Sequence, residues 1–209
     1  MQVLKYAAVL MTAILATGCT YSIRMNPDIG PTASIARPVD LRVGLYIPRE
    51  VKGFVMVDRP DLEKYIFEIG ASLESVITKS ANRVFSQVSI LDAQPADDVI
   101  GERQLDLVVI PRVNSAMVSL NREEGPFQDD ARGNTAVSVE LMFYDAEMRQ
   151  FTSVMASGVG FASERIGFFS RGQREYAASV EGALKNLSDD MVRQMYGNYD
   201  IRKKAEESE

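Results

Sequence analysis

Hydrophobic and polar residues alternate in several short stretches of this chain, and alternation of this kind is typical of half-buried β-strands. Residues 41–47 alternate strictly up to Pro48, and residues 135–144 and 151–161 alternate on either side of a short polar turn. The last two segments are therefore expected to form an antiparallel hairpin.

Three further segments complete the expected sheet. Residues 87–91 are typical of a short strand, and residues 105–110 are almost continuously apolar, as in a central strand covered on both faces. Residues 113–120 continue either as a separate strand or as the same strand beyond a bulge.

Two longer segments repeat apolar residues at the spacing of an amphipathic helix. The first runs from residue 62 or 67 to residue 85, and the second from residue 174 to residue 196, where Gly197 ends it. This order of elements predicts an α+β fold. It is a two-layer sandwich, with two amphipathic helices on one face of a mostly antiparallel sheet of four to six strands.

The expected domain spans residues 41–197. A charged tail at residues 198–209 follows it and is expected to lack regular structure. Residues 19–40 carry three prolines and no periodicity, which is typical of a tether. The alternative for this segment is a strap that packs in part along the edge of the domain.

The segment before the tether has the layout of a secretory signal peptide. Lys5 precedes an apolar run that ends in Ala16-Thr17-Gly18-Cys19, and Cys19 is the only cysteine in the chain. These four residues resemble a lipobox, at which a signal peptidase cuts before a diacylated cysteine. Residues 1–18 are therefore interpreted as a lipoprotein signal peptide, and Cys19 as the lipid attachment site.

This segment has two other interpretations. A transmembrane anchor needs about 20 apolar residues, and this run is shorter. An ordinary signal peptide with a coincidental cysteine is the second. Thr20 stands where an inner-membrane retention signal often has Asp, so the expected location is the outer membrane, lipid-anchored on its periplasmic face.

Composition narrows the possible chemistry. The chain has no histidine, which excludes Ser-His-Asp and Cys-His catalysis and removes the commonest general base. With Cys19 acylated, a zinc site of Cys and His is excluded as well. Paired carboxylates remain conceivable in an enzyme, but we expect a non-enzymatic protein without cofactor or metal. The net charge of −6 argues against nucleic-acid binding.

Acidic pairs and glycines are interpreted as structural. Asp97-Asp98, Asp129-Asp130 and Asp189-Asp190 lack the spacing of a calcium loop and are expected to be solvated charges. Gly158 and Gly160 are not followed by a phosphate-binding motif, so they are expected to permit a bulge or a close backbone approach.

Two loops carry adjacent apolar residues that are candidates for contact with a partner. One is Gly53-Phe54-Val55-Met56-Val57, and the other is Ile166-Gly167-Phe168-Phe169-Ser170-Arg171-Gly172. The candidate contact residues are Phe54, Met56, Phe168, Phe169 and Arg171. The alternative is that at least one aromatic ring in each loop caps the core.

The order of elements resembles periplasmic lipoproteins with a small α/β domain, the type that includes PelC, CsgG, LpoB and the N-terminal domain of TolB. The segments that carry this resemblance are Val43–Pro48, Ile69–Phe85, Val88–Asp92 and Asp106–Pro111. The lipoprotein LptE has a comparable order and is a second candidate. The resemblance carries over no functional residue except the acylated Cys19.

Together these observations predict a membrane-anchored periplasmic lipoprotein. It is expected to act as a non-enzymatic accessory or structural subunit of an envelope assembly or export machine, with a protein partner or a second copy of itself. The alternative is a transport accessory that binds an envelope lipid or glycan, which requires an apolar cavity or groove.

Overall fold

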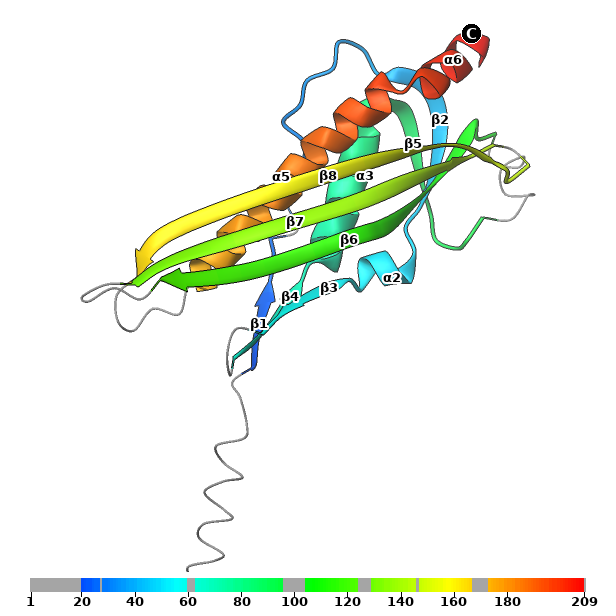
Figure 1. The fold of residues 1–209 in the computed structure, drawn as a ribbon. Helices are drawn as coiled ribbons and strands as arrows, with labels where there is room; N and C mark the ends of the chain where they lie inside the picture. Colours follow the sequence, from blue (N-terminus) through cyan, green and yellow to red (C-terminus); the bar gives the residue numbers. More distant parts are fainter. Residues whose placement is uncertain are drawn as a thin grey trace, which may run out of the picture.

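The computed structural model shows an α+β fold with a large and a small sheet (Figure 1). It describes residues 20–26, 28–59, 63–95, 104–123, 129–145, 147–166 and 173–208. Within these ranges the strands are β1 (Thr20–Arg24), β2 (Val39–Tyr46), β3 (Val55–Asp58), β4 (Lys64–Glu68), β5 (Phe85–Leu91), β6 (Leu107–Glu123), β7 (Asp129–Tyr144) and β8 (Gln150–Ile166). The helices are α2 (Arg49–Lys52), α3 (Gly70–Val84), α5 (Gln173–Gly197) and α6 (Tyr199–Ser208).

The large sheet has five strands in the order β5-β2-β6-β7-β8 and is mixed. β2 pairs in parallel with both β5 and β6, whereas β6, β7 and β8 form long antiparallel ladders. The expected sheet of four to six strands is confirmed, but its pairing is mixed, because the two pairings of β2 are parallel and only the long ladders of β6, β7 and β8 are antiparallel. The parallel pairing of β2 and β5 follows from the crossover through α3, since parallel neighbours need a long connection.

The predicted hairpin is confirmed and is longer than the alternation indicated. β7 and β8 pair from Asp129 with Ile166 to Tyr144 with Gln150. β6 is one strand of 17 residues whose register shifts between Val113 and Ser115, so the second half continues the first beyond an irregularity. Residues 113–120 are therefore the continuation of the central strand beyond a bulge and do not form a separate strand.

Helices α3 and α5 lie together on one face of the large sheet, as predicted (Figure 1). They contact each other through small side chains, with Ser80 Oγ 3.0 Å from Ser188 Oγ. Their apolar faces and the inner face of the sheet form the main core, which includes Val43, Leu73, Ile77, Leu107, Val139, Phe143, Leu184 and Met191.

Glycines let α5 approach β8 closely. A Cβ atom added to Gly160 would lie 1.9 Å from the carbonyl oxygen of Ser179, and one added to Gly158 would lie 2.0 Å from that of Ala183. The close backbone approach expected for these glycines is confirmed.

Residues 64–68 form strand β4, although the first helix was expected to begin at residue 62 or 67. Tyr65 and Phe67 are fully buried and their neighbours are half-buried, so this segment alternates like a strand. Aromatic and β-branched residues favour a pleated surface over a helix. The helix itself begins at Gly70.

The segment before β2 is packed against the domain. β1 pairs in parallel with β4, and β4 pairs with β3, to make the small sheet. Residues 25–26 and 28–38, which we call the strap, run along α3 and α5 with Met25 buried. Asp189 on α5 accepts hydrogen bonds from the backbone N–H groups of Thr32 and Ala33, at 2.6 and 2.7 Å. The expectation of a free tether is therefore wrong for residues 20–26 and 28–40.

The expected disordered tail also differs from the structure, because residues 199–208 form α6. The side chain of Asn198 accepts a hydrogen bond from the backbone N–H of Ile201, which caps the first turn. Ile201 is fully buried in the core and Ala205 packs against it, so two apolar residues anchor an otherwise charged helix.

The free edge of β8 is contacted by polar side chains of α5. Asp190 accepts a hydrogen bond from the backbone N–H of Ser157 at 2.9 Å, and Asn186 donates one to the carbonyl oxygen of Val159 at 2.7 Å. Asp189 and Asp190 thus bind backbone groups, whereas they were expected to be solvated charges. Asp97-Asp98 lies outside the described residues.

Candidate interaction surface

The face of the large sheet that is turned away from α3 and α5 carries exposed apolar side chains. In each strand the residues of one parity point into the core and those of the other parity point outward. On β6, β7 and β8 the register places Met117, Ala136 and Val159 in one row across the strands. The next row toward the strand ends contains Ser119, Asn134 and Phe161. We call this set of outward residues the open sheet face.

Exposure is highest toward one end of this face. Phe161 is 75 % exposed and Met117 is 61 %, and Met155 and Val159 are 47 % and 44 %. Small and polar residues lie between them, including a row of Ser115, Ser138 and Ser157. The face therefore combines large apolar side chains with hydroxyl groups, on a support that α5 holds from behind.

The other end of the same face is covered. Leu91, Leu105 and Val108 form a small second core there, which also contacts Ile110 and Tyr144. Gly44 lies beneath this cluster, and a Cβ atom at Gly44 would lie 2.7 Å from Leu105 Cδ1. The most exposed apolar residues of β6, β7 and β8 thus lie on the part that extends beyond β2, whereas Phe151 is 37 % exposed near the covered end.

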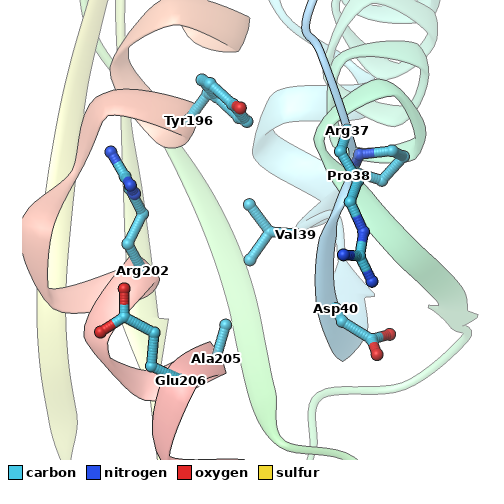
Figure 2. A pocket seen from close by; sticks show the side chains of 8 residues that line it. All are labelled: Arg37, Pro38, Val39, Asp40, Tyr196, Arg202, Ala205 and Glu206. Carbon is cyan, nitrogen blue, oxygen red and sulfur yellow. The ribbon is translucent and has the colours of Figure 1, made fainter. Parts of the chain in front are cut away.

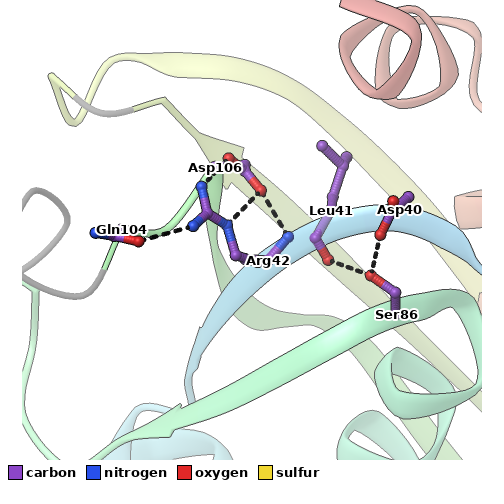
Figure 3. A network of polar contacts seen from close by, with 6 residues as sticks. All are labelled: Asp40, Leu41, Arg42, Ser86, Gln104 and Asp106. Atoms are coloured by element: carbon purple, nitrogen blue, oxygen red, sulfur yellow. Dashed lines mark hydrogen bonds and ion pairs between the residues drawn. The ribbon is translucent and has the colours of Figure 1, made fainter. Parts of the chain in front are cut away.

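Figure 3 shows the polar contacts that fix the end of the sheet near this second core. The carboxylate of Asp106 accepts hydrogen bonds from the backbone N–H of Arg42 at 2.7 Å and from its guanidinium at 3.1 Å. Gln104 accepts a further bond from Arg42 at 3.2 Å. Partial burial acts to raise the pKa of Asp106, but the hydrogen bonds from Arg42 outweigh it and hold that pKa below its usual range.

A groove opens where β2 leaves β6. The two strands pair only at residues 43–45 and 107–109, after which α2 and β3 lie beside β6. The space between α2 and β6 is a groove of about 340 Å³. Its lining is mostly apolar and consists of Pro48, Glu50, Val51, Phe54, Ile110, Pro111, Arg112, Val113 and Met142.

A second hollow lies on the outer face of the small sheet and has a volume of about 660 Å³. Phe54 lines both hollows, so its ring forms part of the wall between them. Arg24 and Glu68 line the second hollow and form an ion pair at 3.0 Å. The hydrogen bond from Ser22 lowers the pKa of Glu68, and the charge of Arg24 adds to that effect against desolvation.

Figure 2 shows a smaller hollow of about 180 Å³ between the start of β2 and α6. Two cations, Arg37 and Arg202, and two carboxylates, Asp40 and Glu206, line it together with Tyr196. Because both signs of charge occur in equal number, the hollow does not select a ligand of one charge.

The sequence-predicted contact residues are only partly described. Phe54 is half-buried in the wall of the groove. Met56 is 4 % exposed and packs in the core, so its expected exposure is wrong, because the alternation of β3 turns Val55 and Val57 outward instead. Cys19, Phe168, Phe169 and Arg171 lie outside the described residues, and their roles stay predictions.

The open sheet face was missed from the sequence, although a signal for it was present. In residues 151–161 Ala156, Gly158 and Gly160 share one parity, and Phe151, Met155, Val159 and Phe161 share the other. Glycines that admit a helix mark the inner face, so the larger residues of the opposite parity had to point outward. The alternation alone did not show which face the helices cover.

Within the described ranges, none of the helices is both long and apolar enough to cross a membrane. In that same part of the chain, no three or more acidic or thiol side chains gather as a metal ion would require.

Comparison with known proteins gives solved structures only. No family model and no curated protein matches the chain. A neuraminyllactose-binding hemagglutinin homolog from Helicobacter pylori is 11 % identical with a TM-score of 0.47, over 89 % of this chain and 98 % of that chain. A minor lipoprotein from Acinetobacter baumannii is 12 % identical with a TM-score of 0.37, over 77 % and 95 %.

A PelC dodecamer from Paraburkholderia phytofirmans is 14 % identical with a TM-score of 0.36, over 79 % of this chain and 92 % of that chain. PelC is among the proteins that the order of elements resembled in the sequence. At these TM-scores and identities, the likenesses carry no argument about the function of this chain.

Proposed function

We propose that this protein is a lipid-anchored accessory or structural subunit of an envelope assembly or export machine. In this role acylated Cys19 holds the protein at the outer membrane, on its periplasmic face, and the open sheet face binds a protein partner. The role is non-enzymatic, in keeping with the absence of histidine from the sequence.

The observation that carries the proposal is the cluster of Met117, Met155, Val159 and Phe161 on the open sheet face. Apolar side chains that gather on a surface often mark an interface, and Met and aromatic residues are enriched there. The hydroxyl groups of the serine row supply the polar contacts that interfaces contain. The support is rigid, because α5 packs directly against the backbone of β8.

The test is photocrosslinking in cells, with a photoreactive residue placed at Val159 and, in a matched control, at exposed Glu181 on α5. We expect crosslinks from position 159 to one protein, or to a second copy of this chain, and none of these from position 181. Val159→Asp should abolish the association measured by co-purification. An exposed substitution changes stability by only about 0.5 kcal/mol or less. Equal capture from both positions would refute the proposal.

A second function is favoured by a separate observation, the apolar groove beside Phe54. Its volume of about 340 Å³ fits the lower end of the range for small-molecule sites, about 300–1,000 Å³. We propose as the alternative that this groove binds an acyl chain or glycan of the envelope. Native mass spectrometry of the parent protein should then detect a bound lipid or glycan. Met142→Trp should fill the groove and remove this ligand, while the crosslinks from position 159 persist.

A further inference from the structure

We propose that the small sheet contacts the lipid headgroups through its row of Val57, Ile66 and Ser22. This inference rests on the proposed acylation of Cys19, and it adds which surface of the domain faces the bilayer. It follows from where the anchored residue stands in the chain and from the register of three strands.

The chain leaves no slack between the anchor and the domain. β1 begins at Thr20, directly after Cys19, and neighbouring Cα atoms are about 3.8 Å apart. Thr20 is already paired with Lys64 in the small sheet. The start of β1 is therefore held at the membrane surface, whereas a flexible tether would have allowed the domain to move away from it.

The register then sets the height of each row above the anchor. Ser22 pairs with Ile66, and Ile66 pairs with Val57, so these three side chains form one row on the same face. This row lies two residues from Thr20, or about 7 Å at the rise of a β-strand. The row of Arg24, Glu68 and Val55 lies four residues away, or about 13 Å.

Headgroups and interface occupy about 5–8 Å on each side of the hydrocarbon core. The first row is therefore within the headgroup layer when β1 stands upright, and a tilt toward this face lowers it further. Val57 is 46 % exposed at one end of this row, and Ser22 is exposed at the other end, with half-buried Ile66 between them. A row that is apolar at one end and carries a hydroxyl group at the other is suited to an interface that is partly apolar and partly wet. In contrast, α6 lies at the opposite end of the molecule from β1 (Figure 1).

The single cysteine makes a direct test possible, because an engineered cysteine is the only free thiol once Cys19 is acylated. A solvatochromic fluorophore is attached to Val57→Cys, to Ser22→Cys in the same row, and to Tyr199→Cys on α6 as the distant control. Each acylated full-length protein is placed in vesicles of phosphatidylethanolamine and phosphatidylglycerol that carry a headgroup-attached nitroxide quencher. Circular dichroism confirms that each labelled protein is folded.

We expect loss of fluorescence at positions 57 and 22 and none at position 199. The same three labels on a Cys19→Ser chain should not be quenched, because that protein lacks the anchor. An acylated protein that is quenched at neither 57 nor 22, or equally at all three positions, overturns the inference and leaves the proposed anchoring intact. Failure of the anchoring itself is read separately, as an unmodified Cys19 in the mass spectrum of the N-terminal peptide.

Discussion

Replacing Gly160 with alanine tests whether the close approach of α5 to β8 is required for stability. The new Cβ atom would lie 1.9 Å from the carbonyl oxygen of Ser179 and 2.4 Å from the backbone nitrogen of Ala183. The first distance is about 1.5 Å short of an ordinary contact of 3.4 Å. Both obstructing atoms belong to the helix backbone, so no side-chain rotation can relieve the overlap.

The helix must move away from the strand, and its packed side chains move with it. Val180, Ala183, Leu184 and Leu187 of α5 are all fully buried. A gap of about 0.5–1 Å removes a quarter to a half of the attraction at each contact. Overpacked cores are usually destabilised by about 1–3 kcal/mol. Because the obstruction is rigid backbone, we expect the upper end of that range for Gly160→Ala, about 3 kcal/mol.

The measurement is equilibrium unfolding in urea, followed by circular dichroism and tyrosine fluorescence, since the chain has eight tyrosines and no tryptophan. With a urea m-value of about 2 kcal/mol/M, the midpoint should fall by about 1.5 M. Gly182→Ala on α5 is the matched control, because its Cβ atom would lie 3.5 Å from Gly160 Cα on the facing strand β8, which is an ordinary contact. It should stabilise the protein by about 0.5–1 kcal/mol through helix propensity.

The reasoning is refuted if Gly160→Ala and Gly182→Ala give the same unfolding free energy. That result would mean that α5 has freedom to shift without losing its contacts.

Three further substitutions test other contacts by the same unfolding assay. Asp189→Asn should cost about 1–2 kcal/mol at pH 7. Partial burial acts to raise the pKa of Asp189, but hydrogen bonds from the strap outweigh it and lower that pKa. The ionised carboxylate therefore stabilises the folded protein fully above the ordinary pKa of aspartate, and this stabilisation is lost as the pH falls through the lowered pKa of the folded state. The difference from the parent should therefore shrink toward pH 3, and a constant difference would contradict this account. Tyr176→Phe removes the hydroxyl that donates a hydrogen bond to Asp58 and should lower the free energy of unfolding by about 1–2 kcal/mol. An unchanged free energy of unfolding would mean that this hydrogen bond is no stronger than the bonds that both groups make with water in the unfolded chain. Ile201→Ala should cost about 2–4 kcal/mol, and a neutral result would mean that α6 does not depend on its buried residue.

The repetitive elements of this fold could be predicted from the sequence because their apolar residues follow one period. The alternation at residues 135–144 and 151–161 and the helical spacing at 174–196 indicated β7, β8 and α5 closely. The direction of pairing could not be read in the same way. Residues 87–91 and 41–47 look alike as strands, and only the crossover through α3 makes their pairing parallel.

The errors fall on segments whose structure depends on distant partners. The strap and β1 contain too few apolar residues to indicate an element, and contacts with Asp189 and β4 hold them in place. α6 is highly charged, and the one signal for its packing was Ile201. The prediction of the contact residues failed for a similar reason. Adjacent apolar residues at 54–57 indicated a surface, but the strand alternation decided that Val55 and Val57 face outward and Met56 does not.

The two hydrogen bonds between α5 and the edge of β8 also bear on how this protein avoids self-templated aggregation. An edge strand of 17 residues such as β8 can pair with strands from other chains, which leads to cross-β aggregation. Asp190 and Asn186 form hydrogen bonds with backbone groups of Ser157 and Val159 in the middle of this edge. An incoming strand therefore cannot form a continuous ladder of hydrogen bonds with β8. The apolar open sheet face beside this edge can therefore stay exposed to solvent without polymerisation of the chain along β8.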